Sequence, residues 1–450
     1  MTGYLVRFVS ANEQKMVNNS YNSRQEILLS QNYRGSILAK DGEVLAETLL
    51  DEEQNETRVY PYDNLFAHVV GYSTKGRTGI EDLANYYLIN TNTSLSNKVA
   101  NDVAGVKNPG DNVYTTLDLE LQRVADEHLG VYDGAIIVTE VSTGKILAMV
   151  SHPNFNPNEM DELWEKLLDD KDSGVLLNRA TQGLYPPGST FKIATALELI
   201  RQDPDAMEDY SFQCNGYFSH NGEKIICFHG KQHGKVDLER SFAKSCNSSF
   251  ANIGIGLDRE KFAETLEELL FNQELPVDLA YSRSSMDVSD ELPDITMMQT
   301  AMGQGHTLVT PLHLNMITCA IANDGVLMKP YVIDRVVNDA GEPVKTYHPK
   351  EYGRLMSEEE AEILTTLMTA VIESGTATKL SGREYTVAGK TGSAEYSSVD
   401  DECHAWFTGF APVENPEICV TIIMEKTGSG GDYAVPIVRR IFDAYFEGKK

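Results

Sequence analysis

The strongest constraint on the fold is a pair of short, wholly apolar runs, residues 134–138 and 146–150, joined by the turn Ser142-Thr143-Gly144-Lys145. Such a pair predicts a β-hairpin, and the lack of polar alternation predicts a sheet covered on both faces. Helical segments follow, and three further strands are expected near residues 385–387, 405–410 and 418–424. Two strands, several helices and three more strands predict an α+β fold: a mainly antiparallel five-stranded sheet flanked by helices.

Helix start signals support this order of elements. Thr310-Pro311 supplies an N-cap residue followed by proline at the first helical position. Ser357-Glu358-Glu359-Glu360 is a capping box. We therefore expect helices to begin at these two points.

Residues 10–113 differ from the rest of the chain, being polar and rich in asparagine. They contain short strand-like pieces at 36–38 and 43–45, joined by the turn signal Lys40-Asp41-Gly42-Glu43. The cluster Lys107-Asn108-Pro109-Gly110-Asp111 strongly disfavours regular structure. We place a domain boundary just after it, giving domains 1–113 and 114–450.

Charge and composition exclude some functions. With 38 basic and 67 acidic residues the net charge is −29, so nucleic acid is not an expected partner, because phosphate is repelled by such a surface. The six cysteines are too scattered for a disulfide framework. No run approaches the roughly 20 apolar residues of a membrane span. The apolar stretch Tyr4–Val9 is read either as a frayed terminus or as the remnant of a membrane helix.

A candidate nucleophile lies at Ser189, which follows Tyr185-Pro186-Pro187-Gly188 and precedes a helical segment. A serine at a helix N-terminus meets free N–H groups and a favourable dipole. Lys192, three residues on, shares its helix face and is a suitable base if burial lowers its pKa. The same spacing recurs at Ser142 with Lys145, read as a hairpin turn, and at Ser241 with Lys244, read as a helix face.

Two more patterns carry chemistry. Ser245-Cys246-Asn247 lies in a partly buried segment, where a hydroxyl and an amide could pass a proton and hold a substrate carbonyl. Lys390-Thr391-Gly392-Ser393 lies in a strand context, where lysine and threonine suit a carboxylate. The similar Lys426-Thr427-Gly428 closes a strand and is interpreted as a loop.

The order of these three patterns, Ser-x-x-Lys, Ser-x-Asn and Lys-Thr-Gly, resembles the penicillin-recognising serine enzymes. Flanking segments resemble the penicillin-binding proteins, and the N-terminal segments resemble the pedestal of their class B members. The resemblance therefore implies an elongated β-rich N-terminal pedestal ahead of a transpeptidase domain. The segments are Leu177-Asn178-Arg179-Ala180, Gly303-Gln304-Gly305, Glu373-Ser374-Gly375-Thr376-Ala377, Trp406-Phe407-Thr408-Gly409, Arg34-Gly35-Ser36-Ile37 and Gly79-Ile80-Glu81.

The resemblance also implies a reaction, the cross-linking of peptidoglycan stem peptides through an acyl-enzyme, with inhibition by β-lactams. No metal or organic cofactor is expected. The roles it implies are Ser189 as nucleophile, Lys192 as base, Ser245 as proton relay, Asn247 as orienting amide, Lys390 and Thr391 as carboxylate ligands within the Lys390-Thr391-Gly392-Ser393 strand, and the N–H groups of Ser189 and Ser393 as oxyanion hole.

Two alternatives share these motifs. One is a hydrolase, a D,D-carboxypeptidase or β-lactamase, which passes the acyl group to water. The other is a non-catalytic β-lactam sensor. The resemblance further implies stem peptides, β-lactams and a membrane glycosyltransferase as partners. It implies a single-pass membrane anchor that this chain lacks, with the catalytic domain outside the cytoplasm.

Four potential metal ligands remain outside these motifs: Cys214, Cys227, His229 and His233. Soft cysteine and histidine ligands suit zinc, but the tight Cys-x-x-Cys spacing is absent. A local disulfide, or cysteines buried as small apolar residues, explains the same pattern. In each case we expect a supporting role for this loop.

Overall fold

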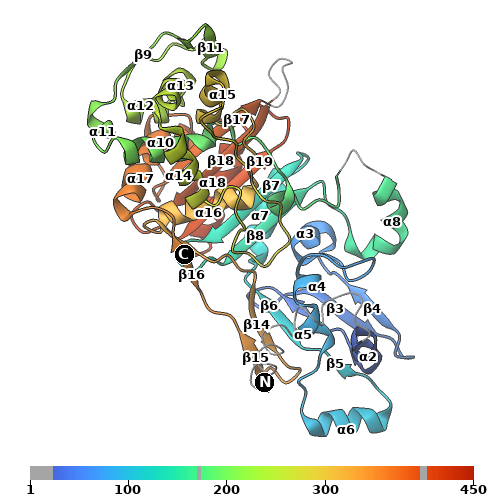
Figure 1. The fold of residues 1–450 in the computed structure, drawn as a ribbon. Coiled ribbons are helices and arrows are strands. Elements are labelled where there is room, and N and C mark those ends of the chain that lie inside the picture. The colour runs from blue at the N-terminus through green and yellow to red at the C-terminus, as the bar shows by residue number, and fades with distance from the viewer. Residues whose placement is uncertain (1–23, 170–173, 396–402, 450) are drawn as a thin grey trace, which may run out of the picture. The chain divides into compact units, whose positions relative to one another are not determined.

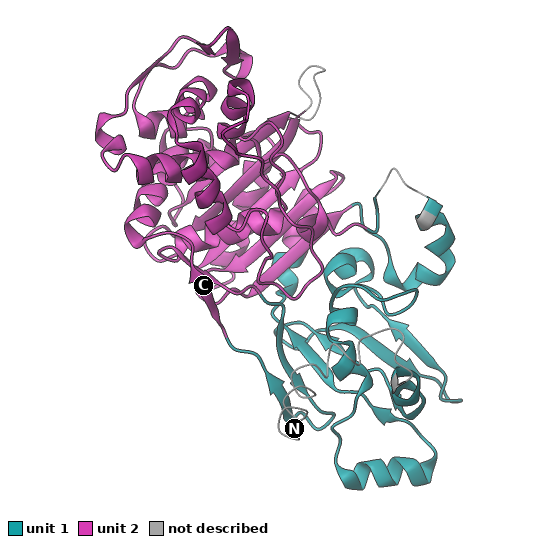
Figure 2. Ribbon diagram, viewed as in Figure 1, with its two compact units in different colours: residues 1–122, 153–176, 331–348 teal, residues 123–152, 177–330, 349–450 magenta. Residues whose placement is uncertain are grey.

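The computed structural model describes residues 24–169, 174–395 and 403–449, which form two compact units (Figure 2). The first unit takes the described residues up to Gln122, together with 153–176 and 331–348; the second takes 123–152, 177–330 and the described residues from 349 on. Each unit is therefore built from three separate segments of the chain. The single boundary between residues 113 and 114 stays a prediction.

The second unit is built on a five-stranded sheet with the order β17-β18-β19-β7-β8 (Figure 1). All four strand pairings are antiparallel. The side chains of β7, β8, β18 and β19 are buried at almost every position, so both faces are covered. The predicted fold class is thus confirmed. The strands are β7 (Gly134–Glu140), β8 (Ile146–His152), β17 (Ala388–Glu395), β18 (Cys403–Ala411) and β19 (Ile418–Met424).

One expected strand is shifted. The sequence predicts a strand near residues 385–387, but β17 begins at Ala388. Its pairing with β18 opposes Lys390 to Thr408 and Gly392 to Trp406. The whole Lys-Thr-Gly segment therefore lies inside an edge strand of the sheet.

Helix α16 (Pro311–Ala322) is the central buried helix of this unit and packs against β7, β18 and β19. As predicted, Thr310 is its N-cap residue, and the Thr310 Oγ1 accepts from the His313 N–H. Thr318 Oγ1 lies 2.7 Å from Thr408 Oγ1 on the sheet. Helix α17 (Glu358–Glu373) begins with the predicted capping box at Ser357.

Smaller helices and strands complete the second unit. A ribbon formed by β9 and β12 and a hairpin formed by β10 and β11 lie in the chain before α12. The elements are α7 (Leu119–Leu129, which begins in the first unit), α9 (Arg179–Gln182), η3 (Gly188–Phe191), α10 (Lys192–Gln202), α11 (Ala206–Asp209), β9 (Phe212–Cys214), β10 (Tyr217–His220), β11 (Glu223–Ile226), η4 (Phe228–Gly230), β12 (Gly234–Val236), α12 (Leu238–Ala243), α13 (Asn247–Gly256), α14 (Arg259–Glu268), α15 (Asp294–Ala301), β13 (Val326–Met328), β16 (Glu351–Arg354), η5 (Thr378–Leu380) and α18 (Ala434–Glu447).

The first unit contains a six-stranded sheet with the order β15-β14-β6-β2-β3-β4. The predicted pieces at 36–38 and 43–45 form its antiparallel pair β2 and β3. Strands β14 and β15 come from residues 333–346; β14 pairs with β6, and β15 pairs with β14. The elements are α2 (Arg24–Gln31), β1 (Asn32–Tyr33), β2 (Ile37–Leu38), β3 (Val44–Leu50), β4 (Glu56–Val59), η1 (Asp63–Phe66), α3 (Ala67–Val70), α4 (Gly79–Leu83), α5 (Asn85–Ile89), α6 (Leu95–Ala104), β5 (Asn108–Pro109), β6 (Asn112–Thr115), η2 (Pro157–Glu159), α8 (Met160–Asp169), β14 (Ile333–Val337) and β15 (Pro343–Thr346).

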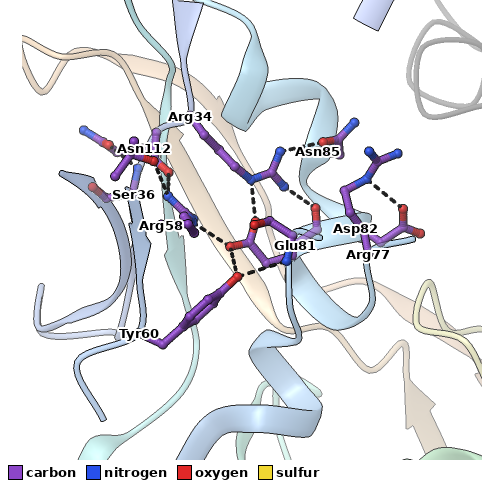
Figure 3. A network of polar contacts seen from close by, with 12 residues as sticks. Arg34, Ser36, Arg58, Tyr60, Arg77, Glu81, Asp82, Asn85 and Asn112 are labelled. Carbon is purple, nitrogen blue, oxygen red and sulfur yellow. Dashed lines mark hydrogen bonds and ion pairs between the residues drawn. The ribbon is translucent and has the colours of Figure 1, made fainter. Parts of the chain in front are cut away.

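A buried charge network ties this unit together around Glu81 of α4, which is fully buried (Figure 3). Arg34 and Arg58 each donate from Nε to one carboxylate oxygen of Glu81. Tyr60 donates its hydroxyl to the same carboxylate at 3.1 Å. Burial acts to raise the pKa of Glu81, but the two guanidinium groups outweigh it, so the pKa is lowered. The Arg-Gly and Gly-Ile-Glu segments that the sequence singled out thus meet in one ion cluster.

No helix within the described ranges combines the length and apolar character needed to cross a membrane. The apolar stretch Tyr4–Val9 lies outside the described residues.

Candidate active site

Ser189 lies in the one-turn helix η3, directly before α10 begins at Lys192. The sequence predicts an α-helix that opens at Ser189. In the structure Ser189 lies instead in the 3-10 turn η3, and the α-helix begins three residues later, at Lys192. Gly188 takes φ +54°, and a Cβ there would lie 3.0 Å from the backbone of Ser393 and Ala394. Glycine is required because the turn packs directly on β17. Ser189 itself is partly exposed.

Lys192 is fully buried, and its Nζ is held by the Ser-x-Asn segment. Nζ donates to the carbonyl of Ser245 at 2.9 Å, to its Oγ at 3.2 Å and to Asn247 Oδ1 at 2.8 Å. Burial lowers the pKa of Lys192 to about 8, because the charged form loses hydration. The neutral form is therefore far more populated near physiological pH than that of an ordinary lysine, as a general base requires.

The Ser-x-Asn segment forms the N-terminus of α13. Cys246 is the N-cap residue, and its Sγ accepts from the Ser249 N–H at 3.4 Å. Ser245 has φ +56°, an unusual conformation for a residue with a Cβ. Such strain persists only where the surroundings fix the backbone, and it clusters at functional sites.

Lys390 of β17 approaches the same hydroxyl from the sheet. Its Nζ donates to Ser245 Oγ at 3.0 Å and to the Thr391 carbonyl at 3.1 Å. Lys390 is fully buried, and burial, followed by the charge of Lys192, lowers its pKa well below the ordinary value. Ser245 Oγ thus receives hydrogen bonds from two lysine amines, which leaves its own proton free to be donated.

Small residues let β17 pack closely beside this group. A Cβ at Gly392 would lie 3.0 Å from the Pro187 carbonyl oxygen. Ser393 is partly exposed, and its Oγ accepts from the Gly430 N–H at 3.4 Å. Thr391 Oγ1 lies 2.5 Å from Thr376 Oγ1.

The competing motif matches lie elsewhere. Ser142 is an exposed residue of the β7–β8 turn. Ser241 is buried on α12 and accepts from Ser249 Oγ, whereas Lys244 donates to the Ser374 carbonyl. Lys426-Thr427-Gly428 is a loop after β19, as interpreted from sequence.

Motif reasoning did not assign two residues that shape the site. Gly303 has φ +86°, and its carbonyl accepts the Gly188 N–H at 2.8 Å. Thr376 contacts Thr391 as described above. Both lie in flanking segments that carry the resemblance, and this was the only signal available for them.

The four potential metal ligands named from the sequence are not the four that meet. Cys214, Cys227, His233 and Cys246 bring their ligand atoms within 4.8 Å of one another. We call this group the Cys3His cluster. His229 is exposed and does not belong to it. Cys246, the N-cap residue of α13, takes the place that the sequence had suggested for His229. The cysteines are free thiols in the structure, so the alternative of a local disulfide is not realised there.

A five-stranded antiparallel sheet that carries Lys-Thr-Gly beside a Ser-x-x-Lys turn and a Ser-x-Asn helix cap defines a penicillin-recognising serine enzyme. The similarity of the chain to known protein families gives the same assignment. Residues 134–443 match the family model of the penicillin binding protein transpeptidase domain, and residues 34–113 match that of the penicillin binding protein A dimerisation domain. The chain therefore belongs to the penicillin-binding protein transpeptidases. The predicted family and enzyme class are confirmed.

Relatives match along nearly the whole chain. Peptidoglycan D,D-transpeptidase PbpA of Mycolicibacterium smegmatis is 30% identical over 445 residues, covering 92% of this chain and 90% of the relative. The D,D-transpeptidase domain of a peptidoglycan glycosyltransferase from Eggerthella lenta has a TM-score of 0.84 at 30% identity, covering 93% and 99% of the two chains. Penicillin-binding protein A of M. tuberculosis, solved as an imipenem acyl-enzyme complex, has a TM-score of 0.83 at 26% identity, covering 92% and 99%.

Proposed function

We propose that this chain is a peptidoglycan D,D-transpeptidase that acts through an acyl-enzyme on Ser189. The observation that carries the proposal is the placement of Ser245 Oγ between the amines of Lys192 and Lys390, at 3.2 and 3.0 Å. It links all three motifs into one hydrogen-bonded group beside a partly exposed serine. The relatives named D,D-transpeptidases support the substrate class.

The proposed acylation assigns each of these residues a step. Ser189 Oγ attacks the carbonyl carbon of the penultimate D-Ala while the neutral Lys192 amine takes its proton. The N–H groups of Ser189 and Ser393 stabilise the oxyanion. When the C–N bond breaks, Ser245 gives its proton to the departing amine of the terminal D-Ala and is reprotonated through Lys192.

Substrate binding uses the strand and the amide. Lys390 and Thr391 hold the terminal carboxylate, and Gly392 lets the peptide lie close to β17. Asn247 orients the peptide backbone. An amine of a second stem peptide then attacks the ester, forming the cross-link and returning the proton and the free hydroxyl to Ser189.

The setting of the enzyme belongs to the same proposal. We place the catalytic domain outside the cytoplasm, where peptidoglycan is found, with a membrane glycosyltransferase supplying the glycan strands. Residues 1–113 act as the pedestal and residues 114–450 as the transpeptidase domain. The family membership supports this assignment.

Labelled penicillin tests the nucleophile. Ser189→Ala should abolish covalent labelling without changing the melting temperature, because the side chain is small and partly exposed. Ser142→Ala is the matched control, since it alters the same Ser-x-x-Lys spacing in an exposed turn, and should label normally. Labelling that survives in Ser189→Ala contradicts the assignment.

A labelled D-Ala-D-Ala donor tests the reaction. With an amine acceptor we expect a cross-linked product. Hydrolysis that no amine can divert would instead identify a carboxypeptidase or β-lactamase. The absence of both a cross-linked and a hydrolysed product would identify a β-lactam sensor.

A further inference from the structure

A cavity of about 430 Å³ opens beside the buried charge network of the first unit. All the residues that line it belong to that unit, and Arg34, Arg58 and Asn85 are among them. Figure 3 shows these three side chains gathered around Glu81. We call this space the arginine cavity. It shares no residue with the active site described above, whose residues belong to the second unit.

The network beside the cavity carries one positive charge in excess. Arg34 and Arg58 both donate to Glu81, so two guanidinium groups face one carboxylate. Burial, opposed by Glu81 but reinforced by the charge of Arg58, lowers the pKa of Arg34. Positive charge that is buried without a full counter-charge is costly, and an anion is the kind of group that relieves it.

The other charged residues of the lining do not remove this excess, because each pairs with a residue of opposite charge. The pairs are Arg77 with Asp82 at 3.6 Å, Glu56 with Lys107 at 2.5 Å and Asp161 with Lys75 at 3.4 Å. The cavity lining and its partners therefore keep a net charge of +1, although the chain as a whole has a net charge of −29.

Two buried NH2 groups of the lining lack an acceptor. Arg58 Nη2 and Asn85 Nδ2 have no hydrogen-bond partner among the described residues. The Arg58 side chain is only 10% exposed, and Asn85 is 1% exposed. The other polar atoms of Arg58 donate to Glu81 and to the Gly35 carbonyl. Asn85 Oδ1 accepts from Arg34. Unpaired buried donors are rare in folded proteins, so these two indicate an acceptor that comes from a ligand.

The size and lining of the cavity indicate a polar ligand larger than a bare ion. Its volume of about 430 Å³ lies in the range of small-molecule sites, which is roughly 300–1,000 Å³. The hydroxyl-bearing residues Thr48, Thr57, Ser73 and Thr74 line the same space. A sugar that carries a carboxylate or phosphate group offers an oxyanion to the buried donors and hydroxyl groups to this lining.

We propose that the arginine cavity binds the carboxylate or phosphate group of an anionic sugar, with Arg58 and Asn85 as its hydrogen-bond donors. Arg34 contributes positive charge, while its own N–H groups stay bonded to Glu81 and Asn85. The cavity is a binding site only, where no bond is made or broken. It goes beyond the proposed acyl transfer and does not depend on it.

Calorimetric titration of the purified full chain tests the site. The probe is glucose 6-phosphate, with inorganic phosphate and acetate as bare oxyanions and glucose as the uncharged control. We expect glucose 6-phosphate to bind more tightly than inorganic phosphate, and glucose not to bind. Rising salt concentration should weaken binding, because it screens the charge of the guanidinium groups.

Asn85→Asp is the decisive variant. Its carboxylate keeps the acceptor for Arg34, removes the unpaired NH2 group and supplies the missing negative charge from within the chain. The affinity for glucose 6-phosphate should fall at least about tenfold, because two anions would then meet in one buried place. Asn97→Asp is the matched control, since it adds the same charge at an exposed position of the same unit, outside the cavity, and should bind like the parent. If Asn85→Asp does not fold, Ser73→Asp places the charge on the cavity wall instead.

The proposal is overturned if none of the oxyanions binds to the parent at millimolar concentration, the result expected if ordered water satisfies the two donors. Unchanged affinity in folded Asn85→Asp or Ser73→Asp also overturns it, because the ligand then binds elsewhere. An equal loss in Asn97→Asp would reduce the effect to general repulsion by added charge and contradict the site. Inorganic phosphate that binds as tightly as glucose 6-phosphate would reject the sugar as the ligand class.

Discussion

Replacing Glu81 by glutamine tests how the first unit is stabilised. The carboxylate neutralises Arg34 and Arg58, whose side chains are only 9% and 10% exposed. Glutamine keeps the shape but has one acceptor oxygen, and its NH2 group would face a guanidinium group that also only donates. Two buried cations would then lack a counter-charge.

The magnitude follows from the buried position. Glu81 accepts three side-chain hydrogen bonds, from Arg34, Arg58 and Tyr60. Removing one partner of a buried ion pair costs about 3–5 kcal/mol. At about 1.4 kcal/mol for each factor of ten, local opening should become roughly 10²–10⁴-fold more frequent.

Amide hydrogen exchange measures this locally. Peptides covering β3 and α4 should exchange faster in Glu81→Gln, whereas peptides covering β18 in the second unit serve as an internal reference. Asp161→Asn is the matched control: its ion pair with Lys75 in the same unit joins side chains that are 72% and 41% exposed. It should change stability by no more than about 0.5 kcal/mol.

The pH dependence gives a second check. The pKa of Glu81 is lowered in the folded protein, so its stabilisation is present above the unfolded value of about 4.3 and is lost as pH falls through the lower folded value. The difference between parent and Glu81→Gln should therefore shrink in acid. A loss below about 1 kcal/mol at neutral pH, or a difference that grows in acid, would refute the reasoning.

Two further predictions concern the active site. The second-order rate of penicillin acylation should rise with pH up to about 8 and then level off, because the pKa of Lys192 is lowered to about 8 and its neutral form is the base; a stopped-flow profile that is flat from pH 6 to 9 would argue against this role. Gly303→Ala should slow acylation by at least about a hundredfold, since its Cβ would lie 1.7 Å from the Gly188 carbonyl oxygen and displace the Ser189 turn. Gly256→Ala, where a Cβ meets nothing within 4 Å, is the control and should acylate at the parent rate.

Local patterns determined much of this protein from sequence alone. Wholly apolar runs marked β7 and β8, and largely apolar runs marked β18 and β19, because a strand buried on both faces does not alternate with polar residues. Thr310 and Ser357 marked two helix starts, because capping is satisfied within a single turn of chain. The order of three short motifs indicated the family.

Only the tertiary structure decided which distant residues meet. Strands β14 and β15 join the first unit although they lie far along the chain, and nothing local in their sequence indicates this. Ser245 was expected to lie near the nucleophile, but its place between two lysine amines depends on contacts across 53 and 145 residues. Likewise, it is Cys246 and not His229 that lies beside Cys214 and Cys227, because the tertiary structure brings the helix cap to this loop. Spacing along the chain limits which residues can share a turn, whereas the direction of a side chain across a packed interface is set by the whole fold.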